Sequence, residues 1–321
     1  MRLLGLDIGG ANTKTSFTDG AELIKRSCYF PIWKKKHQLP SLLSDLINEY
    51  NPVKVGLTMS AELSDAFINK KEGVYYVLDS VESAFKGEIH VLSSDGVFIS
   101  PDEAKANHMR VASANWAATS GYAAKRYDNG VLVDVGSTTT DIIPFRGGEV
   151  VALGKTDLRR LQCGELIYSG ILRTNIATLT DCVPVDGVNT KISAEFFAQT
   201  ADVYTILGLL KQKDYSSETP DGRGKSIKEC CARIGRIVCA DNLMLKDKTI
   251  KETAFYLKKQ QIKKLSQAIK KISEKWGINQ AYICGSGFPL GKEAATKAGL
   301  KAHKLEIDSS TALLDLLNKN S

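Results

Sequence analysis

Two short stretches of the chain combine an aspartate, glycines and small hydroxyl side chains in a pattern suited to binding phosphate. The first, LGLDIGGANTKT, covers residues 4–15, and the second, VLVDVGSTTTD, covers residues 131–141. Asp7 and Asp134 are 127 positions apart, as are Gly9 and Gly136. A single Asp-x-Gly stretch is most simply a hairpin turn. Its repetition at matched positions favours a ligand-binding function.

The chemistry of these turns points to phosphate. Glycines let the backbone approach an anion closely through unusual φ angles, and successive backbone N–H groups form an anion-binding nest. Hydroxyl, amide and ammonium side chains add further donors. The predicted phosphate-binding residues are Gly9, Gly10, Asn12, Thr13, Lys14, Gly136, Ser137, Thr138, Thr139, Thr140, Gly285 and Gly287. The last two belong to a third glycine turn, ICGSG, which follows an apolar run.

Three carboxylates in these stretches are predicted to bind Mg²⁺. Asp7, Asp134 and Asp141 would repel a phosphate unless a hard cation lies between them. We therefore expect two nests and up to three acids to hold a magnesium–polyphosphate group between two domains.

Strands and helices alternate along the chain, which indicates an α/β fold. Each repeated stretch continues into a second β-rich run, so two structurally related α/β domains around a central cleft are expected. The first covers residues 1–127 and the second residues 128–308, and a helix at about 309–320 returns to the first. Residues 54–60 are predicted to form a buried strand followed by a helix start, and residues 113–127 a helix.

The composition is that of an ordinary soluble protein, with 43% hydrophobic and 25% charged residues. No run of apolar residues is long enough to span a membrane, and no signal peptide is evident. The net charge of +7 comes largely from lysines on amphipathic helices, so no nucleic-acid partner is expected. The seven cysteines suit buried thiols in a cytoplasmic protein. Whether the chain forms a homo-oligomer is left open.

The two hairpins and the Gly-Ser-Gly turn resemble the phosphate 1, phosphate 2 and adenosine elements of the actin-like ATPase superfamily. The resemblance covers the whole chain and implies a ribonuclease H-like fold. The segments GLTMSAEL, ANW, QCGELIYSGILRT, EFFAQTADVY and TPDGRGKS are similar to a short hydantoinase/oxoprolinase-like branch that acts in methanofuran biosynthesis, in methanogenesis and related one-carbon metabolism.

This resemblance implies a transferase with Mg²⁺ as cofactor and two small-molecule substrates. It would join an aminomethylfuran-methyl diphosphate to the phenol oxygen of γ-glutamyltyramine, a phenolic amine, and release diphosphate. A phenol has a pKa near 10, so a carboxylate base would help it lose its proton. Glu62 and Glu165 are the candidates for that base or for binding the substrate ammonium group. They can equally be carboxylates at helix starts.

Arg173 is a candidate for binding the glutamyl carboxylate, although an ordinary surface arginine explains it as well. An alternative function is an ATP-dependent small-molecule kinase or hydantoinase-type amidohydrolase, with ATP in the same cleft and Asp65 as a base. A nucleotide-dependent switch or scaffold is a third alternative.

Overall fold

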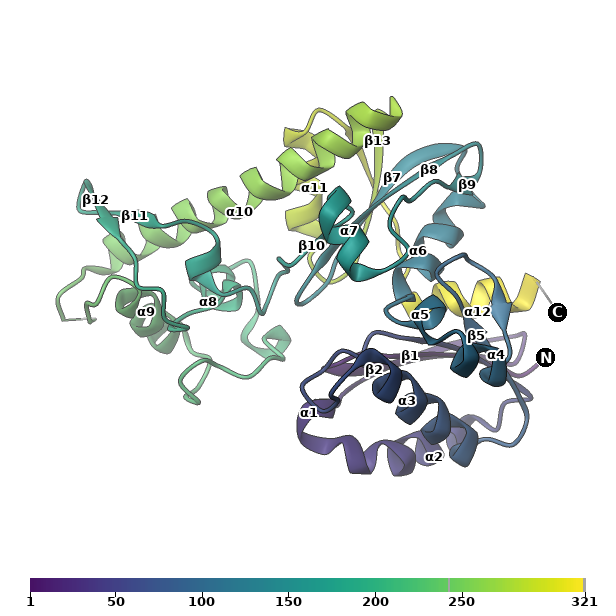
Figure 1. Ribbon diagram of the computed structural model, residues 1–321. Helices are drawn as coiled ribbons and strands as arrows, with labels where there is room; N and C mark the ends of the chain where they lie inside the picture. Colours follow the sequence, from purple (N-terminus) through teal and green to yellow (C-terminus); the bar gives the residue numbers. More distant parts are fainter. Residues whose placement is uncertain (242, 320–321) are drawn as a thin grey trace. The chain divides into compact units, whose positions relative to one another are not determined.

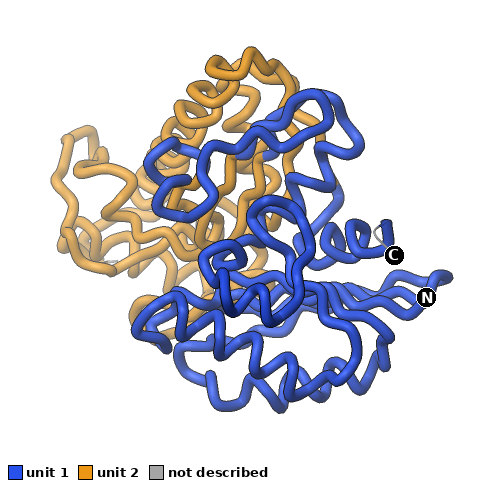
Figure 2. The backbone as a smooth tube through the Cα atoms, turned by 45° about the vertical axis from the view of Figure 1, so that its right-hand side comes forward, with its two compact units in different colours: residues 1–132, 143–165, 306–321 blue, residues 133–142, 166–305 orange. Residues whose placement is uncertain are grey.

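The computed structural model describes residues 1–241 and 243–319, which form two compact units (Figure 2). Unit 1 comprises residues 1–132, 143–165 and the C-terminal segment from residue 306 onward. Unit 2 comprises residues 133–142 and 166–305. Residues 143–165, expected in the second domain, thus group with unit 1. The chain passes between the units within the strands β7 and β8.

Unit 1 is built on a six-stranded sheet with the order β3-β2-β1-β4-β5-β6. β1 pairs antiparallel with β2 and parallel with β4, so a hairpin lies beside a set of parallel strands. The strands are β1 (Leu3–Ile8), β2 (Asn12–Thr18), β3 (Leu23–Tyr29), β4 (Lys54–Met59), β5 (Glu88–Leu92) and β6 (Phe98–Ile99). The carboxyl ends of β1 and β4 meet at one edge of this sheet, because the two strands are parallel.

Helices cover both faces of this sheet (Figure 1). Buried leucine, isoleucine and valine side chains of α2 and α3 pack with those of β1 and β4 in one core. The helix α12 lies on the opposite face, where Leu314 and Leu317 contact Leu3. The helical segments are α1 (Ile32–Lys35), η1 (Lys36–Gln38), α2 (Leu39–Tyr50), α3 (Lys70–Ala84), α4 (Pro101–Ala106), α5 (His108–Val111), α6 (Asn115–Ala124), α7 (Asp157–Cys163) and α12 (Ser309–Lys319).

A second sheet has the order β10-β8-β7-β13-β14, with β9 paired to β8. Its strands are β7 (Asn129–Val135), β8 (Thr140–Arg146), β9 (Glu149–Val150), β10 (Leu166–Ile167), β13 (Gln280–Cys284) and β14 (Lys301–Lys304). The other elements of unit 2 are η2 (Ile176–Thr178), β11 (Cys182–Val185), β12 (Val188–Lys191), α8 (Thr200–Ile206), η3 (Gln212–Asp214), α9 (Ile227–Arg236), α10 (Asp247–Trp276) and α11 (Phe288–Lys297).

The two repeated stretches form turns with the same backbone hydrogen bond. The N–H of Gly9 donates to the carbonyl of Asn12 over 3.0 Å, and the N–H of Gly136 donates to the carbonyl of Thr139 over 2.9 Å. The spacing of 127 positions is therefore kept in the hydrogen bonding of both turns. Each turn joins neighbouring strands of its sheet, β1 to β2 and β7 to β8.

Several elements differ in length from those expected. The strand at residues 54–60 is β4, but no helix follows at once, because α3 begins only at Lys70 behind its N-cap Asn69. The helix expected at residues 113–127 is α6, which begins at Asn115. Among the helices that the structure describes, none is both long and apolar enough to cross a membrane.

Candidate functional site

Asp7 is a buried carboxylate at the carboxyl end of β1. One of its oxygens, Oδ2, accepts a hydrogen bond from the hydroxyl of Ser309, the first residue of α12. Its other oxygen, Oδ1, has no hydrogen-bond partner among the described residues. Burial raises the pKa of Asp7, although the nearby charge of Lys14 and the Ser309 hydrogen bond oppose the rise. Asp7 therefore has one oxygen held and one open.

The residues around Asp7 are suited to a hydrated divalent cation. Lys14 of β2 and Thr58 of β4 stand opposite Asp7 in the register of the sheet. The Thr58 hydroxyl is buried and, like Asp7 Oδ1, has no partner among the described residues. No group of three His, Cys, Asp or Glu side chains gathers as a metal site in the described parts of the chain. Mg²⁺ commonly uses only one or two carboxylates and completes its shell with water and phosphate, so this donor set fits it.

The first turn leaves two consecutive N–H groups open. The carbonyl of Gly10 accepts from the N–H of Ile32 and that of Ala11 from the N–H of Phe30. No described residue accepts from the N–H groups of Gly10 or Ala11. Such unpaired donors on consecutive residues are the essential feature of an anion nest.

The reason for glycine at this turn differs from the one expected. Neither Gly9 nor Gly10 has a positive φ, so conformational freedom does not explain them. A Cβ at Gly9 would lie 2.8 Å from the Asn12 carbonyl oxygen, which excludes a side chain. A Cβ at Gly10 would meet no atom within 4 Å, so this position is open to a ligand. The predicted donor Thr13 is buried on the opposite face of β2 from Lys14.

In the second turn, as in the first, carbonyl groups accept hydrogen bonds from other parts of the chain, whereas consecutive N–H groups have no acceptor among the described residues. The N–H of Ile171 donates to the carbonyl of Gly136, and the N–H groups of Leu172 and Arg173 donate to that of Ser137. The structure thus brings the predicted Arg173 beside this turn through its backbone. Within the described chain, the N–H groups of Ser137, Thr138 and Thr139 have no acceptor. Thr140 differs, because its buried hydroxyl donates to the Ser169 carbonyl over 2.6 Å.

The third glycine turn packs directly against the end of β7. Gly285 has a φ of +83°, and a Cβ there would lie 2.5 Å from Oδ1 of Asp134. The N–H of Gly287 donates to the Val135 carbonyl, and a Cβ at Gly287 would lie 2.3 Å from the Val135 side chain. Close packing therefore explains both glycines without a ligand. Asp134 lies beside this turn, and Asp141 is a buried residue of β8 paired with Leu166 of β10.

Glu62 lies in a buried cluster of charged side chains in unit 1. Its Oε1 accepts a hydrogen bond of 2.6 Å from the Ser113 hydroxyl and lies 3.3 Å from Nζ of Lys70. Lys70 Nζ also donates to Ser113 and forms an ion pair of 3.1 Å with Asp157. The second oxygen of Glu62, Oε2, is buried and has no partner among the described residues.

The charges in this cluster act on one another. Burial raises the pKa of Glu62, while the ammonium of Lys70 and the Ser113 hydroxyl oppose the rise. Burial lowers the pKa of Lys70, but Glu62 and Asp157 together raise it above its usual value. Lys70 therefore stays a cation and compensates the buried carboxylate of Glu62.

Glu165 is held by backbone donors. Its Oε1 accepts from the N–H of Leu153 over 2.8 Å, and its Oε2 accepts from the N–H of Gly154 over 2.9 Å. Arg160 lies next to it, with its guanidinium over the Trp116 ring and 3.4 Å from the Glu165 carbonyl oxygen. Both carboxylate oxygens of Glu165 are thus occupied by protein N–H groups.

The alternative interpretation placed both glutamates at helix starts, but neither of them lies there. Glu62 precedes α3 by eight positions, and Glu165 follows the end of α7. Instead, the segments SAEL, ANW and CGEL lie around one cluster in unit 1. Their connections are Lys70, Ser113, Asp157 and Arg160, which the sequence analysis did not select. A left-handed φ of +51° at Ser113 is a further local feature that no motif indicated.

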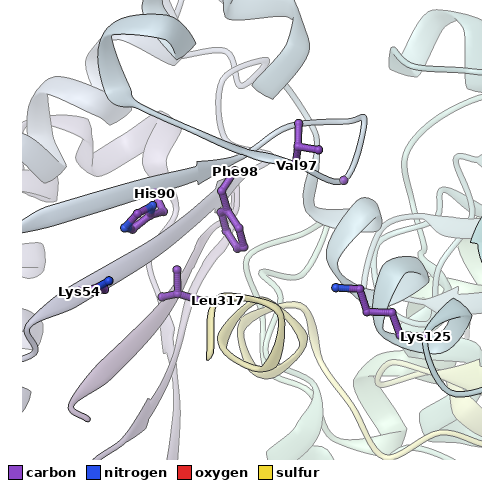
Figure 3. A pocket seen from close by; sticks show the side chains of 7 residues that line it. Lys54, His90, Val97, Phe98, Lys125 and Leu317 are labelled. Atoms are coloured by element: carbon purple, nitrogen blue, oxygen red, sulfur yellow. The ribbon is translucent and has the colours of Figure 1, made fainter. Parts of the chain in front are cut away.

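A separate hollow of about 370 Å³ lies in unit 1 at the amino end of β4 (Figure 3). Lys54, His90 and Lys125 line it together with Phe98 and Leu317. Lys54 forms an ion pair with Glu88 over 3.1 Å, which neutralises part of its charge. None of the residues predicted from the sequence lines this hollow.

The family of the chain follows from its sequence as a whole. The hydantoinase/oxoprolinase family model matches residues 54–307. The chain belongs to this family. It is also 40% identical over 295 residues to a protein of Methanocaldococcus jannaschii named (4-{4-[2-(gamma-L-glutamylamino)ethyl]phenoxymethyl}furan-2-yl)methanamine synthase. That match covers 91% of this chain and 88% of the relative, so the predicted branch of the family is confirmed.

Solved structures identify the fold. An acetone carboxylase in nucleotide-free form has a TM-score of 0.60 at 10% identity, covering 98% of this chain and 70% of that one. A ROK family glucokinase from Streptomyces griseus, solved with glucose and AMPPNP, has a TM-score of 0.50 at 11% identity over 99% of both chains. At such low identity these likenesses show the fold alone. They confirm the predicted actin-like fold.

The occupied oxygens of Glu165 lead to a prediction about stability. In Glu165→Gln the side-chain NH₂ cannot accept a hydrogen bond, so one buried backbone N–H loses its partner, which costs about 1–3 kcal/mol. Chemical denaturation should show this loss in the free energy of unfolding. The exposed Glu149, changed to Gln, is the matched control and should stay within about 0.5 kcal/mol of the parent. Equal stabilities for Glu165→Gln and the control would contradict the assignment.

The raised pKa of Asp7 leads to a prediction about pH. Below the usual aspartate pKa of 3.8 both folded and unfolded chains hold the proton, and the burial of Asp7 costs no ionisation energy. As the pH rises above that value, the unfolded chain loses the proton first, so folding becomes less favourable. Asp7→Asn removes this loss. Without divalent cations, the unfolding free energy of Asp7→Asn should therefore increase relative to that of the parent between pH 4 and pH 7.

A matched control for Asp7→Asn is Asp19→Asn. Asp19 is exposed, and hydrogen bonds from the N–H groups of Ala21 and Glu22 lower its pKa. Its carboxylate therefore stabilises the fold above its unfolded pKa, and this contribution is lost as the pH falls through the folded pKa. The variant should lose stability relative to the parent as the pH rises. If the two variants change in the same direction, the effect ascribed to Asp7 is wrong.

Proposed function

We propose that this chain catalyses the ether-forming reaction for which its Methanocaldococcus jannaschii relative is named. In this reaction the bond between the furan methylene and diphosphate breaks, and a bond forms from the same carbon to the phenol oxygen of γ-glutamyltyramine. Diphosphate leaves with the bonding electrons, and the phenol proton passes to the enzyme. The observation that carries this proposal is the 40% identity that extends over 88% of the relative.

The open backbone donors of the first turn support a diphosphate leaving group. In this proposal the N–H groups of Gly10 and Ala11 bind phosphate oxygens, and Lys14 adds a positive charge. Mg²⁺, bound through Asp7, would neutralise the charge that develops on the departing diphosphate. A furan ring stabilises positive charge on its attached methylene, so binding the leaving group is the main demand on the protein.

Glu62 is the better of the two predicted bases. Both oxygens of Glu165 are occupied by N–H groups, whereas Oε2 of Glu62 is without a partner in the described chain. Glu62 itself is fully buried, whereas Ser113, whose hydroxyl is bonded to it, is 7% exposed as a residue. We assign Ser113 to pass the phenol proton to Glu62. Its oxygen accepts the proton from the phenol while its own hydrogen moves to the carboxylate.

The reaction can be tested directly with purified protein. Incubation with the furan diphosphate, γ-glutamyltyramine and Mg²⁺ should give the coupled ether and diphosphate, detected by mass spectrometry and a diphosphate assay. Asp7→Asn should lose most of this activity at limiting Mg²⁺. Absence of the ether, with hydrolysis of ATP instead, would favour an ATP-dependent kinase or amidohydrolase.

A second test addresses the proton acceptor. Because general-base catalysis typically contributes about 10²–10⁴-fold, Glu62→Gln should lower kcat by about this factor with a small change in KM. Burial raises the pKa of Glu62, so the acidic limb of the kcat–pH profile should also disappear in this variant. Asp65→Asn is the control, since Asp65 is an exposed carboxylate three positions away. Full activity in Glu62→Gln, or loss in Asp65→Asn alone, would move the base to another group.

A further inference from the structure

The open oxygen of Asp7 depends on the last helix of the chain. We propose that Ser309 of α12 is a positioning residue, which holds Oδ2 of Asp7 so that Oδ1 and the Thr58 hydroxyl face a hydrated divalent cation. This inference rests on the cation site at Asp7 in the proposed function. It adds two residues, Thr58 and Ser309, that the sequence analysis did not connect with that site.

The helix α12 lies against the sheet of unit 1 (Figure 1), and its start packs closely on the strands. A Cβ at Gly5 of β1 would lie 2.2 Å from the Ser310 carbonyl oxygen, and one at Gly56 of β4 would lie 3.3 Å from Leu313. The hydroxyl of Ser16 in β2 is within hydrogen-bonding distance of Ser310 and Thr311, at 2.9 and 2.8 Å. The helix is therefore anchored without help from Asp7.

The bond between Ser309 and Asp7 thus has another purpose than attaching the helix. Side chains alternate between the faces of a strand, so Asp7 and Thr58 lie on the same face as Gly5 and Gly56. Each lies two residues further along its strand, nearer the start of α12. On that face the helix occupies the space beside the two glycines. Ser309 then donates to one carboxylate oxygen of Asp7, and the other has no partner among the described residues.

Two buried polar atoms are left without partners at this place. They are Oδ1 of Asp7 and Oγ1 of Thr58, which stand opposite each other in adjacent strands. Buried polar atoms are almost always hydrogen-bonded, so this pair indicates a missing ligand. A cation with its water shell satisfies both atoms, since the carboxylate binds the ion or its water and the hydroxyl accepts from that water.

The neighbouring Asp308 has a structural role of its own. Its Oδ1 accepts hydrogen bonds from the Ser310 hydroxyl and from the N–H of Thr311, over 2.7 and 2.9 Å. These contacts make it the cap of α12. Lys14 stands on the other side of Asp7, where its charge suits the phosphate. In this proposal the carboxylate of Asp7 holds the cation, and its orientation depends on Ser309.

This inference can be tested without any substrate by measuring the binding of Mn²⁺ alone. Electron paramagnetic resonance of the free ion and thermal unfolding both report that binding. Residues that orient a metal ligand typically change metal affinity about 10–100-fold when removed. Ser309→Ala and Thr58→Val should weaken Mn²⁺ binding by at least about 10-fold, and Ser309→Thr should restore most of the affinity. Ser310→Ala, which removes a buried hydroxyl from the same helix turn, is the matched control and should stay within about twofold.

Other outcomes overturn the inference. These are no Mn²⁺ binding by the parent, parent-like affinity in Ser309→Ala, or an equal loss in Ser309→Ala and Ser310→Ala. Thr58→Val keeps the shape of the side chain, so it reports on the site even if Ser309→Ala folds poorly. Ether formation by the parent is measured separately. If the parent forms the ether but its Mn²⁺ affinity is unchanged by substitution of Ser309 and Thr58, this inference alone is refuted. If the parent is inactive but the variants change Mn²⁺ affinity as expected, the proposed function alone is refuted.

Discussion

The close approach of α12 to β1 and β4 is the constraint on which the candidate site in unit 1 depends. It requires glycine at position 5, because a Cβ there would meet the Ser310 carbonyl oxygen, and it leaves little room for a side chain at Gly56. The approach brings Ser309 to Asp7, nearly the full length of the chain away in sequence. The leucines that α12 buries against the sheet hold the helix in place, and the helix in turn holds Ser309 at one carboxylate oxygen of Asp7. Packing and chemistry are coupled at this edge of the sheet.

The repeated turns show what a sequence can reveal about such a site. The spacing between Asp7 and Asp134 predicts two similar hairpins, and the backbone hydrogen bonds of Gly9 and Gly136 have the same pattern. This succeeds because a tight turn is a local structure that depends on few residues. The role of each side chain in it is less accessible. Thr140 was predicted to bind phosphate, yet its hydroxyl donates to Ser169, a partner from a distant segment.

The charged cluster around Glu62 marks the limit of reasoning from the sequence. Glu62 and Glu165 follow apolar runs and small residues, so their local patterns are alike. They differ in their partners, which are Lys70 and Ser113 for one and the backbone of residues 153–154 for the other. These partners come from loops and helices whose meeting depends on the whole fold. Motif similarity could therefore select both glutamates but could not separate their roles.

The hydrogen-bond donors that contact each carboxylate distinguish Glu62 from Glu165 in physical terms. A buried carboxylate is costly unless its oxygens are hydrogen-bonded or paired with a cation. Glu165 meets this requirement through two backbone N–H groups, and a proton on either oxygen would weaken the hydrogen bond that this oxygen accepts. Glu62 meets it on one oxygen only, through Lys70 and Ser113, and the hydrogen of the Ser113 hydroxyl can move to that same oxygen, Oε1. In the proposed reaction, Glu62 is therefore the carboxylate better suited to take the proton of the phenol.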